Sequence, residues 1–385
     1  MTRPLVVAVD ASPVRPGTGG VGRYVAELIA HLPDRAAGRP LTVVPLTNRP
    51  DAWLARFHAG QGPSPRAHIA PPPPALIRRP TLAWLQWEAA RQARQPGIAL
   101  FHATTGRAPL RHDRPTVVTV HDTAVIDVPA LFPYRERWLA GLWLRASVPR
   151  ATAIVCVSRS TGEAVLRRWP HTATRMRIVR PGAGEHWMQP PAPLSDELAG
   201  VVGRRWWLHV GACTVLKNVV RLVEAYAHVH RQVGEPVPNL VLVGPEGDAD
   251  AGVRATAAAL GVAERVLPIG PVDDATLHAL YAGAELTACV GLHEGFGLTA
   301  LEALASGCPV VSSGRGGLRD AAPCGALVAD PTAGTALELA LAALGTNASL
   351  RARLGEDGRA HAATATWRRT ALATAEVYAV AVAGD

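Results

Sequence analysis

Two glutamates, Glu294 and Glu302, stand with seven residues between them around a glycine-flanked loop. A helix that begins near Thr299 would place the amides of Gly295 and Gly297 at its N-terminus, where free N–H groups and the helix dipole attract anions. Carboxylates are natural acceptors for pairs of sugar or ribose hydroxyls. The segment therefore predicts a site for a ligand that carries hydroxyls and phosphate.

Each glutamate also has a purely structural explanation. Thr299-Ala-Leu-Glu302 fits a capping box, in which Glu302 only closes the first turn of the helix. Glu294 would then be a solvated loop charge. The functional interpretation is favoured because both glutamates and both glycines occur together.

One cation in the sequence stands out by its type. The chain has 38 arginines and a single lysine, Lys217. A compact ammonium binds an anion as a point charge, whereas a guanidinium binds as a planar fork. Lys217 therefore marks a possible anion site, although one remaining lysine must fall somewhere by chance.

Two series of short apolar runs supply the elements that would position these residues. Continuous apolar runs are typical of strands covered on both faces. The first series is Leu5–Val9, Leu41–Leu46, Ile98–His102, Thr116–His121, Ala153–Ser158 and Met176–Arg180, and the second is Trp206–Val210, Leu240–Gly244, Val266–Gly270, Glu285–Val290, Pro309–Ser313 and Ala326–Val328. Helical segments alternate with them, which predicts two doubly wound parallel α/β sheets.

The proline-rich stretch Pro190–Pro193 predicts the boundary between the two domains. We therefore expect a first domain over residues 1–188, a second over 194–366, and a final helix within 367–385. The 385-residue chain has no apolar run long enough to span a membrane, and its first strand starts too early to leave room for a signal peptide. These features favour a cytoplasmic protein. Five cysteines without a CxxC pair favour buried free thiols.

The charge is distributed unevenly along the chain. Residues 1–185 have a net charge of +14 and residues 186–385 a net charge of −6. A basic first half favours an acidic partner, such as a phosphorylated acceptor or a membrane surface, unless its arginines are simply solvated. Tryptophans and arginines near Trp87 and Trp138 would suit lipid phosphates, and equally an ordinary core face with an arginine rim. No nucleic-acid recognition module is evident, so nucleic acid is not expected as a partner.

The segment from Glu294 to Glu302 resembles the signature of retaining glycosyltransferases of family 4. Further matches extend over essentially the whole chain: Gly17–Tyr24, Val120–Asp122, Ala151–Ser158, Arg180–Gly182, Val210–Gly211, Lys217–Asn218 and Val243–Gly244. The resemblance implies the GT-B fold, in which two Rossmann-like doubly wound domains face each other across a cleft. It assigns acceptor binding to the first domain and nucleotide-sugar binding to the second, and it implies that the last helix crosses back to the first domain.

The resemblance also implies three catalytic residues. Lys217 would bind the diphosphate of the donor, Glu294 would hold hydroxyls of the transferred sugar, and His121 would contact that sugar from the other domain. Residues further implied in donor binding are Gly19, Gly20, Gly295, Phe296, Gly297, Leu298 and Glu302. Glu302 would hold the ribose hydroxyls, and the absence of side chains at Gly19 and Gly20 would let the backbone approach the diphosphate.

The chain departs from the family pattern in its cations. Many members have an arginine directly after the Val210-Gly211 position, where this chain has Ala212, and others have Arg-Lys in place of Leu216-Lys217. The cations that bind the diphosphate would therefore be Lys217 and a further residue that the sequence does not identify.

Other interpretations of the motifs are weaker. Gly17, Gly19 and Gly22 could be fitted to a dinucleotide-binding turn, but the acidic residue about 20 positions further on is not in place. His121-Asp122 could be a metal pair, but no His/Cys cluster supports it, and Asp273 is better explained as a helix cap. We expect no metal and no cofactor, with a nucleoside-diphosphate sugar as co-substrate.

The resemblance thus predicts a retaining hexosyl transfer from a nucleoside-diphosphate sugar to a hydroxyl of a glycan, a lipid-linked or a natural-product acceptor. The His-Asp pattern at 121 is similar to members that use GDP-mannose or a related donor. The alternatives are a sugar-nucleotide epimerase on the same fold and a non-catalytic sugar-nucleotide-binding protein. The basic first domain further suggests a peripheral location at the inner face of the membrane.

Overall fold

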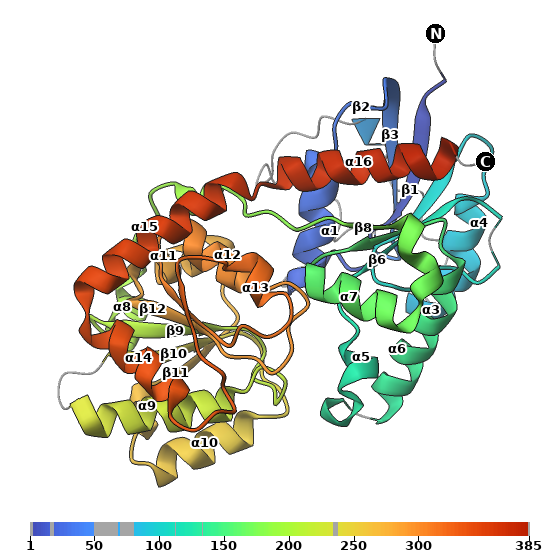
Figure 1. Ribbon diagram of the computed structural model, residues 1–385. Helices are drawn as coiled ribbons and strands as arrows, with labels where there is room; N and C mark the ends of the chain where they lie inside the picture. Colours follow the sequence, from blue (N-terminus) through green and yellow to red (C-terminus); the bar gives the residue numbers. More distant parts are fainter. Residues whose placement is uncertain are drawn as a thin grey trace. The chain divides into compact units, whose positions relative to one another are not determined.

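The computed structural model describes residues 3–15, 19–49, 68–69, 81–111, 113–132, 134–233 and 238–383. The chain forms two compact units, one of residues 1–181 together with 367–385, and one of residues 182–366 (Figure 1). The division falls between Pro181 and Gly182, ahead of the proline stretch that suggested the boundary in the sequence. Trp187 packs edge-on against His278 and Tyr281, which ties residues 182–188 to the second unit.

The first unit is built on a largely parallel sheet. In spatial order its strands are β2 (Arg35–Ala36), β3 (Arg39–Leu46), β1 (Leu5–Asp10), β5 (Leu100–Ala103), β6 (Thr116–Val120), β7 (Ala153–Cys156) and β8 (Met176–Ile178), with β4 (His68–Ile69) paired to β3. Only the short β2–β3 pair is antiparallel among these pairings. β6 and β7 are buried along their whole length, as strands covered on both faces must be.

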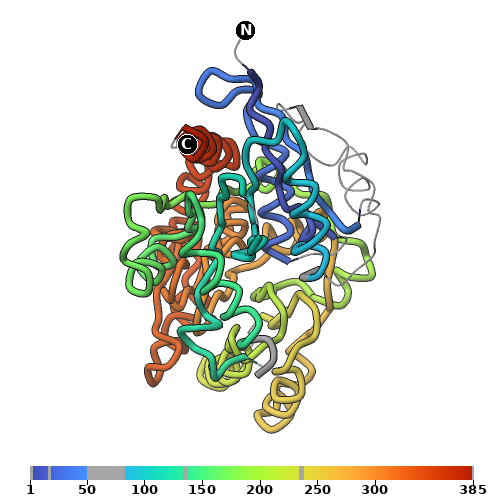
Figure 2. The backbone as a smooth tube through the Cα atoms, turned by 90° about the vertical axis from the view of Figure 1, so that its right-hand side faces the viewer, coloured from blue at the N-terminus to red at the C-terminus, as the bar shows by residue number. Residues whose placement is uncertain are grey.

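Helices surround this sheet, and the last one comes from the far end of the sequence. The described helices are α1 (Gly20–His31), α3 (Thr81–Trp84), a π-helical turn (Leu85–Ala89), α4 (Ala90–Ala93), α5 (Ala124–Asp127), α6 (Tyr134–Ser147), α7 (Arg159–Arg168) and α16 (Trp367–Ala383). Figure 2 shows α16, in red, beside the blue and cyan segments of this unit. The Tyr378 hydroxyl lies 2.7 Å from Nδ1 of the buried His102, and Trp367 packs against Tyr24, so α16 belongs to the core of the first unit.

The second unit has a sheet in which every pairing is parallel. Its order is β11 (Val266–Gly270), β10 (Asn239–Val243), β9 (Trp206–Val210), β12 (Leu286–Cys289), β13 (Val310–Ser312) and β14 (Ala326–Val328). The chain order reverses at β9, which lies between β10 and β12. In a doubly wound sheet this switch point is where the carboxyl ends of adjacent strands open a binding crevice.

The helices of the second unit are α8 (Asp196–Val202), α9 (Val219–Val233), α10 (Asp250–Ala259), α11 (Asp274–Gly283), α12 (Leu298–Ala305), α13 (Leu318–Ala321), α14 (Ala336–Thr346) and α15 (Ala348–Thr364). The core between the sheet and α9, α10 and α14 contains Trp207, Tyr226 and Leu341, all of which are buried. Asp273 accepts a hydrogen bond of 2.7 Å from the Thr276 amide, which confirms that it caps α11.

The sequence-based prediction of two parallel α/β sheets is confirmed. All five cysteines are free, but only Cys156, Cys289 and Cys308 are buried. Cys324 is exposed because it lies in the turn before β14, so the expectation of burial is wrong there. Among the described residues, no helix is both long enough and apolar enough to cross a bilayer.

Candidate functional site

The turn after β9 begins the site in the second unit. Gly211 has a φ of +150°, and its amide donates to the Val243 carbonyl at 2.8 Å. Gly244, after β10, has a φ of +142°, and a Cβ at that position would overlap the Gly211 carbonyl. Two glycines at the ends of adjacent strands therefore let the turn cross the sheet edge closely.

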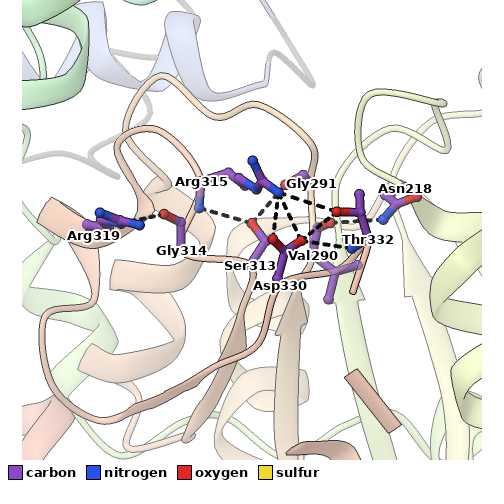
Figure 3. Close-up of polar contacts among 9 residues, drawn as sticks. All are labelled: Asn218, Val290, Gly291, Ser313, Gly314, Arg315, Arg319, Asp330 and Thr332. Carbon is purple, nitrogen blue, oxygen red and sulfur yellow. Dashed lines mark hydrogen bonds and ion pairs between the residues drawn. The ribbon is translucent and has the colours of Figure 1, made fainter. Parts of the chain in front are cut away.

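Lys217 and Glu294 come together at this edge. The Lys217 Nζ donates to Glu294 Oε2 at 2.6 Å, and the two side chains are 25% and 21% exposed. The backbone holds the two loops at this distance, since the Leu292 amide donates to the Leu216 carbonyl at 2.9 Å. Asn218, at a left-handed φ of +59°, also contacts the Val290 carbonyl (Figure 3). Lys217 and Glu294, which are 77 positions apart in the sequence, thus form an ion pair.

A glycine-rich loop after β13 supports the backbone of Glu294. The Gly317 amide donates to the Glu294 carbonyl at 2.7 Å. A Cβ at Gly316, whose φ is +57°, would overlap that same carbonyl, and a Cβ at Gly317 would overlap the Gly295 carbonyl. These two glycines were not predicted as site residues, although the run Gly314-Arg-Gly-Gly317 directly after a strand is a visible signal of close backbone approach.

Polar contacts fix the other end of this loop (Figure 3). The Ser313 hydroxyl donates to the Gly291 carbonyl at 2.7 Å, and Arg319 donates through Nε to the Gly314 carbonyl at 2.8 Å. The Arg315 guanidinium contacts both carboxylate oxygens of Asp330, at 2.8 and 2.9 Å. The loops after β12 and β13 therefore form one hydrogen-bonded body around Glu294.

Helix α12 starts one residue earlier than the sequence suggested, and this removes the capping box. Gly297 is the N-cap, with a φ of +104° and no side-chain cap bond. Thr299 therefore lies inside the helix and does not cap it. Glu302 is buried and accepts a hydrogen bond of 3.4 Å from the Tyr281 hydroxyl. The observed structural role of Glu302 is therefore to accept a hydrogen bond from Tyr281 on α11. The explanation that Glu302 caps α12 is wrong.

The loop that leads into α12 contains the residues that were predicted to bind the donor. Gly295 follows the ion-paired Glu294, Phe296 is buried, and Leu298 is the first helical residue. A Cβ at Gly297 would come within 2.7 Å of the Leu318 side chain. The position therefore needs glycine both for its conformation and for its packing.

His121, the predicted catalytic residue of the first unit, directly follows β6. Its Nε2 donates to the Thr104 carbonyl at 2.8 Å, and its ring centroid lies 4.8 Å from that of Tyr24 in a T-shaped contact. Burial lowers the pKa of His121, although the bond to Thr104 and the Asp122 carboxylate oppose this shift. The imidazole is therefore held in one orientation, with Nδ1 left as an acceptor.

Thr104 connects this histidine to β1, because its hydroxyl donates to the Asp10 carbonyl at 2.7 Å. Burial raises the pKa of the Asp10 carboxyl to about 6, although a bond from the Ser12 amide opposes the shift. Gly19 is the N-cap of α1 and Gly20 its first residue. A Cβ at Gly19 would meet nothing within 4 Å, so the unit itself does not demand glycine there.

No group of three or more His, Cys, Asp or Glu side chains in the described ranges is arranged to hold a metal ion. Metal independence stays a prediction.

Each of the two units matches a family model of known proteins. Residues 18–183 match the model of Glycosyltransferase Family 4, and residues 199–361 match that of Glycosyl transferases group 1. The D-inositol 3-phosphate glycosyltransferase of Xylanimonas cellulosilytica is 31% identical over 70% of this chain and 67% of its own length. The chain belongs to glycosyltransferase family 4. It is therefore a transferase by family, as the resemblance implied.

Other relatives and structures agree with this family 4 membership. The MMP alpha-(1->4)-mannosyltransferase of Mycolicibacterium hassiacum is 28% identical over 70% of this chain and 66% of its own length. The match to the D-inositol 3-phosphate glycosyltransferase of Salinispora arenicola spans 56% of that protein. Sucrose-phosphate synthase from Thermosynechococcus elongatus superposes with a TM-score of 0.74 at 21% identity, over 99% of this chain and all of that one. HepE of Anabaena, in complex with UDP and glucose, gives a TM-score of 0.73 at 18% identity, over 98% and 100%. The fold is GT-B.

Proposed function

We propose that this family 4 glycosyltransferase moves a hexose from a nucleoside-diphosphate sugar to an acceptor hydroxyl, with retention of the anomeric configuration. The observation that carries the proposal is the Lys217–Glu294 pair at the switch point of the second sheet, beside the N-terminus of α12. A cation, a carboxylate and the amides at a helix N-terminus are the groups that a diphosphate and a hexose require.

The ion pair would open when the donor binds. The Lys217 ammonium exchanges Glu294 for a diphosphate oxygen, and the released carboxylate accepts hydrogen bonds from sugar hydroxyls. The amides of Gly295, Phe296 and Gly297, which precede or begin the N-terminus of α12, stabilise negative charge on the sugar and the phosphate. Glu302 holds the ribose hydroxyls in exchange for its contact with Tyr281.

Retention follows from front-face substitution. The bond from the anomeric carbon to the diphosphate oxygen breaks, and the acceptor oxygen bonds to the same face of that carbon. The acceptor's proton passes to the departing phosphate, so that no protein nucleophile and no metal take part. His121 and the glycines at 19 and 20, which belong to the first unit, contribute contacts to the sugar and the diphosphate from that unit.

The donor is proposed to be GDP-mannose or a related nucleoside-diphosphate hexose. The support is the similarity to a protein named as a mannosyltransferase, together with the His-Asp pair at 121. The acceptor is a glycan, a lipid-linked or a natural-product hydroxyl. The similarity to a protein named D-inositol 3-phosphate glycosyltransferase supports a phosphorylated acceptor.

A donor panel tests the proposal. We expect one of the UDP, GDP, ADP or dTDP sugars to raise the melting temperature of the protein. The same sugar nucleotide should be hydrolysed slowly to the nucleoside diphosphate, and EDTA should not lower the rate of this hydrolysis. The assay is thermal shift followed by chromatography of donor-only incubations. Appearance of an epimerised sugar nucleotide would favour the epimerase instead, and stabilisation without any turnover would favour a binding protein.

We further propose peripheral contact with the inner face of the membrane through α6. Its exposed side chains Trp138, Leu139 and Leu142 are 59%, 52% and 55% exposed, and Arg145 is also exposed. They recur at positions that share one helical face, and tryptophan with arginine suits an interface of lipid chains and anionic headgroups.

Vesicle sedimentation measures this contact. The protein should sediment with vesicles that contain phosphatidylglycerol and much less with phosphatidylcholine alone. The double variant Trp138→Ser, Leu142→Ser should lose this binding. Leu339→Ser, which removes a 67% exposed leucine from α14 of the second unit, should not. Equal binding of all three proteins would exclude α6 as the contact.

A further inference from the structure

His209 is a buried histidine at the end of β9, and neither the motifs nor the proposed mechanism uses it. Its side chain is 3% exposed. Nδ1 lies 2.9 Å from the Ala288 carbonyl of the neighbouring strand β12. A carbonyl oxygen can only accept, so Nδ1 carries the proton and Nε2 presents a lone pair. One strand contact thus fixes both the tautomer and the orientation of this ring.

The unpaired Nε2 lies near the Lys217 side chain. Among the described residues, Nε2 is a buried polar atom without a hydrogen-bond partner. A Cβ built on Gly211 would lie 3.8 Å from His209 Nε2 and 3.4 Å from Lys217 Cε, so the imidazole and the lysine stem flank the same point. Buried acceptors are rarely left unpaired, because losing hydration without replacement is costly. An unpaired one beside a ligand site indicates a group that is completed by the ligand or by a proton.

Two charged groups act on this ring. Lys217 is on the turn after β9, and Glu294 is on the loop after β12. Burial, with a smaller effect of Lys217, lowers the pKa of His209 to about 4, although the Ala288 bond and Glu294 oppose the shift. His209 is therefore neutral at pH 7 in the free protein.

A bound diphosphate reverses this balance. It brings at least two negative charges to Lys217, and an opposite charge within about 4–6 Å moves a pKa by about one to three units toward the charged form. A rise of about three units would bring the pKa of His209 close to 7. A neutral imidazole would also turn its lone pair toward phosphate oxygens, which is unfavourable, whereas a protonated Nε2 can donate to them.

We propose that His209 takes up one proton from solvent when a nucleoside diphosphate binds, and that the resulting imidazolium is the second cation of the diphosphate site. It compensates for the arginine that is absent at Ala212. The proton adds to Nε2, which then donates to a phosphate oxygen, and it is released when the nucleotide leaves. This inference rests on the proposed function, since it requires that the diphosphate binds beside Lys217.

The sign of the pH dependence follows. The pKa of His209 is higher in the bound state than in the free state, so protonation adds affinity below the bound-state pKa. That gain is lost as the pH rises through the bound-state pKa. Nucleotide affinity should therefore weaken between about pH 6 and pH 8 in the wild type, and the variant without the imidazole should show a flatter dependence.

Isothermal titration calorimetry measures the proton directly. UDP and GDP are titrated near pH 6, above the pKa of about 4 of His209 in the free protein and below the value close to 7 expected in the complex. The buffers differ in ionisation enthalpy, and the dependence of the heat on the buffer gives the number of protons taken up. We expect the wild type to take up about one proton more than His209→Gln. Protons that belong to the nucleotide or to Glu294 contribute to both proteins, so the difference reports on His209.

A matched control and a second readout keep the result interpretable. His278→Gln removes another buried histidine of the same unit, which lies on α11 and packs against Trp187. This variant should take up protons like the wild type. If His209→Gln does not fold or bind, the imidazole Cε1–H NMR signal of His209, assigned from His209→Asn, should move to the imidazolium position when UDP or GDP is added to the wild type.

The outcomes separate the inference from the function on which it rests. Equal proton uptake by the wild type and His209→Gln, or an imidazole signal that stays at its neutral position in the nucleotide complex, overturns the role of His209 and leaves the proposed function standing. If neither UDP, GDP, ADP nor dTDP binds the wild type, the proposed donor site itself is wrong and the inference falls with it.

Discussion

Replacing Lys217 with alanine should lower turnover by on the order of a hundredfold or more, as single-donor deletions at charge-stabilising sites do. The Lys217 ammonium is held 2.6 Å from Glu294 at the switch point of the sheet. In the proposed reaction the leaving diphosphate gains its negative charge there. Loss of the cation removes that stabilisation, and it also leaves the partly buried Glu294 without its partner. The measurement is the initial rate at saturating donor, with donor affinity determined separately.

Arg221 provides a matched control for this variant. It forms an ion pair of 2.7 Å with Glu338 in the same unit, and its side chain is 23% exposed, close to the 25% of Lys217. Arg221→Ala removes a comparable cation away from the site, so its turnover should stay near that of the wild type. Lys217→Arg should recover only part of the rate, because a planar fork cannot replace a point charge at this distance. Near-normal turnover of Lys217→Ala with intact donor binding would refute the assignment.

The fold was predictable because its strands are strongly patterned. All twelve apolar runs correspond to strands of the two sheets, and runs covered on both faces leave little ambiguity between strand and loop. The short strands β2 and β4 have no such pattern. The role of Gly297 as the N-cap of α12 was not predicted either. Its need for glycine depends on the side chain of Leu318, which is 21 positions further along the chain and packs against it.

The motif residues of the site could be predicted from the sequence, but the contacts that hold them in place could not. Lys217 and Glu294 are chemically conspicuous, and the resemblance placed them together. Their contact itself depends on β9 and β12 being neighbours, with Leu208 in register with Thr287, which a sequence does not state. His209 was missed for a related reason: its tautomer and its unpaired nitrogen follow from the Ala288 carbonyl across the same strand pair.

The second large effect is expected from Gly316→Ala, at a glycine that no motif indicated. Its φ of +57° costs an alanine about 1 kcal/mol or more. The added Cβ would also overlap the Glu294 carbonyl, which accepts the Gly317 amide at 2.7 Å. Since neither partner is a flexible side chain, the backbone of Glu294 must move. A displacement of about 1 Å at a positioned group costs on the order of a hundredfold in rate.

Gly261→Ala separates this displacement from the cost of the backbone conformation. Gly261 has a φ of +73° in the same unit, and a Cβ there would meet nothing within 4 Å. Both variants should lose stability in thermal denaturation, Gly316→Ala by more, but only Gly316→Ala should lose turnover at temperatures where both are folded. Because Glu294 is proposed to hold the sugar and Lys217 the diphosphate, Gly316→Ala should lower the rate far more than the affinity for UDP or GDP. Equal turnover of the two variants would mean that the loop after β13 does not position Glu294 for the reaction.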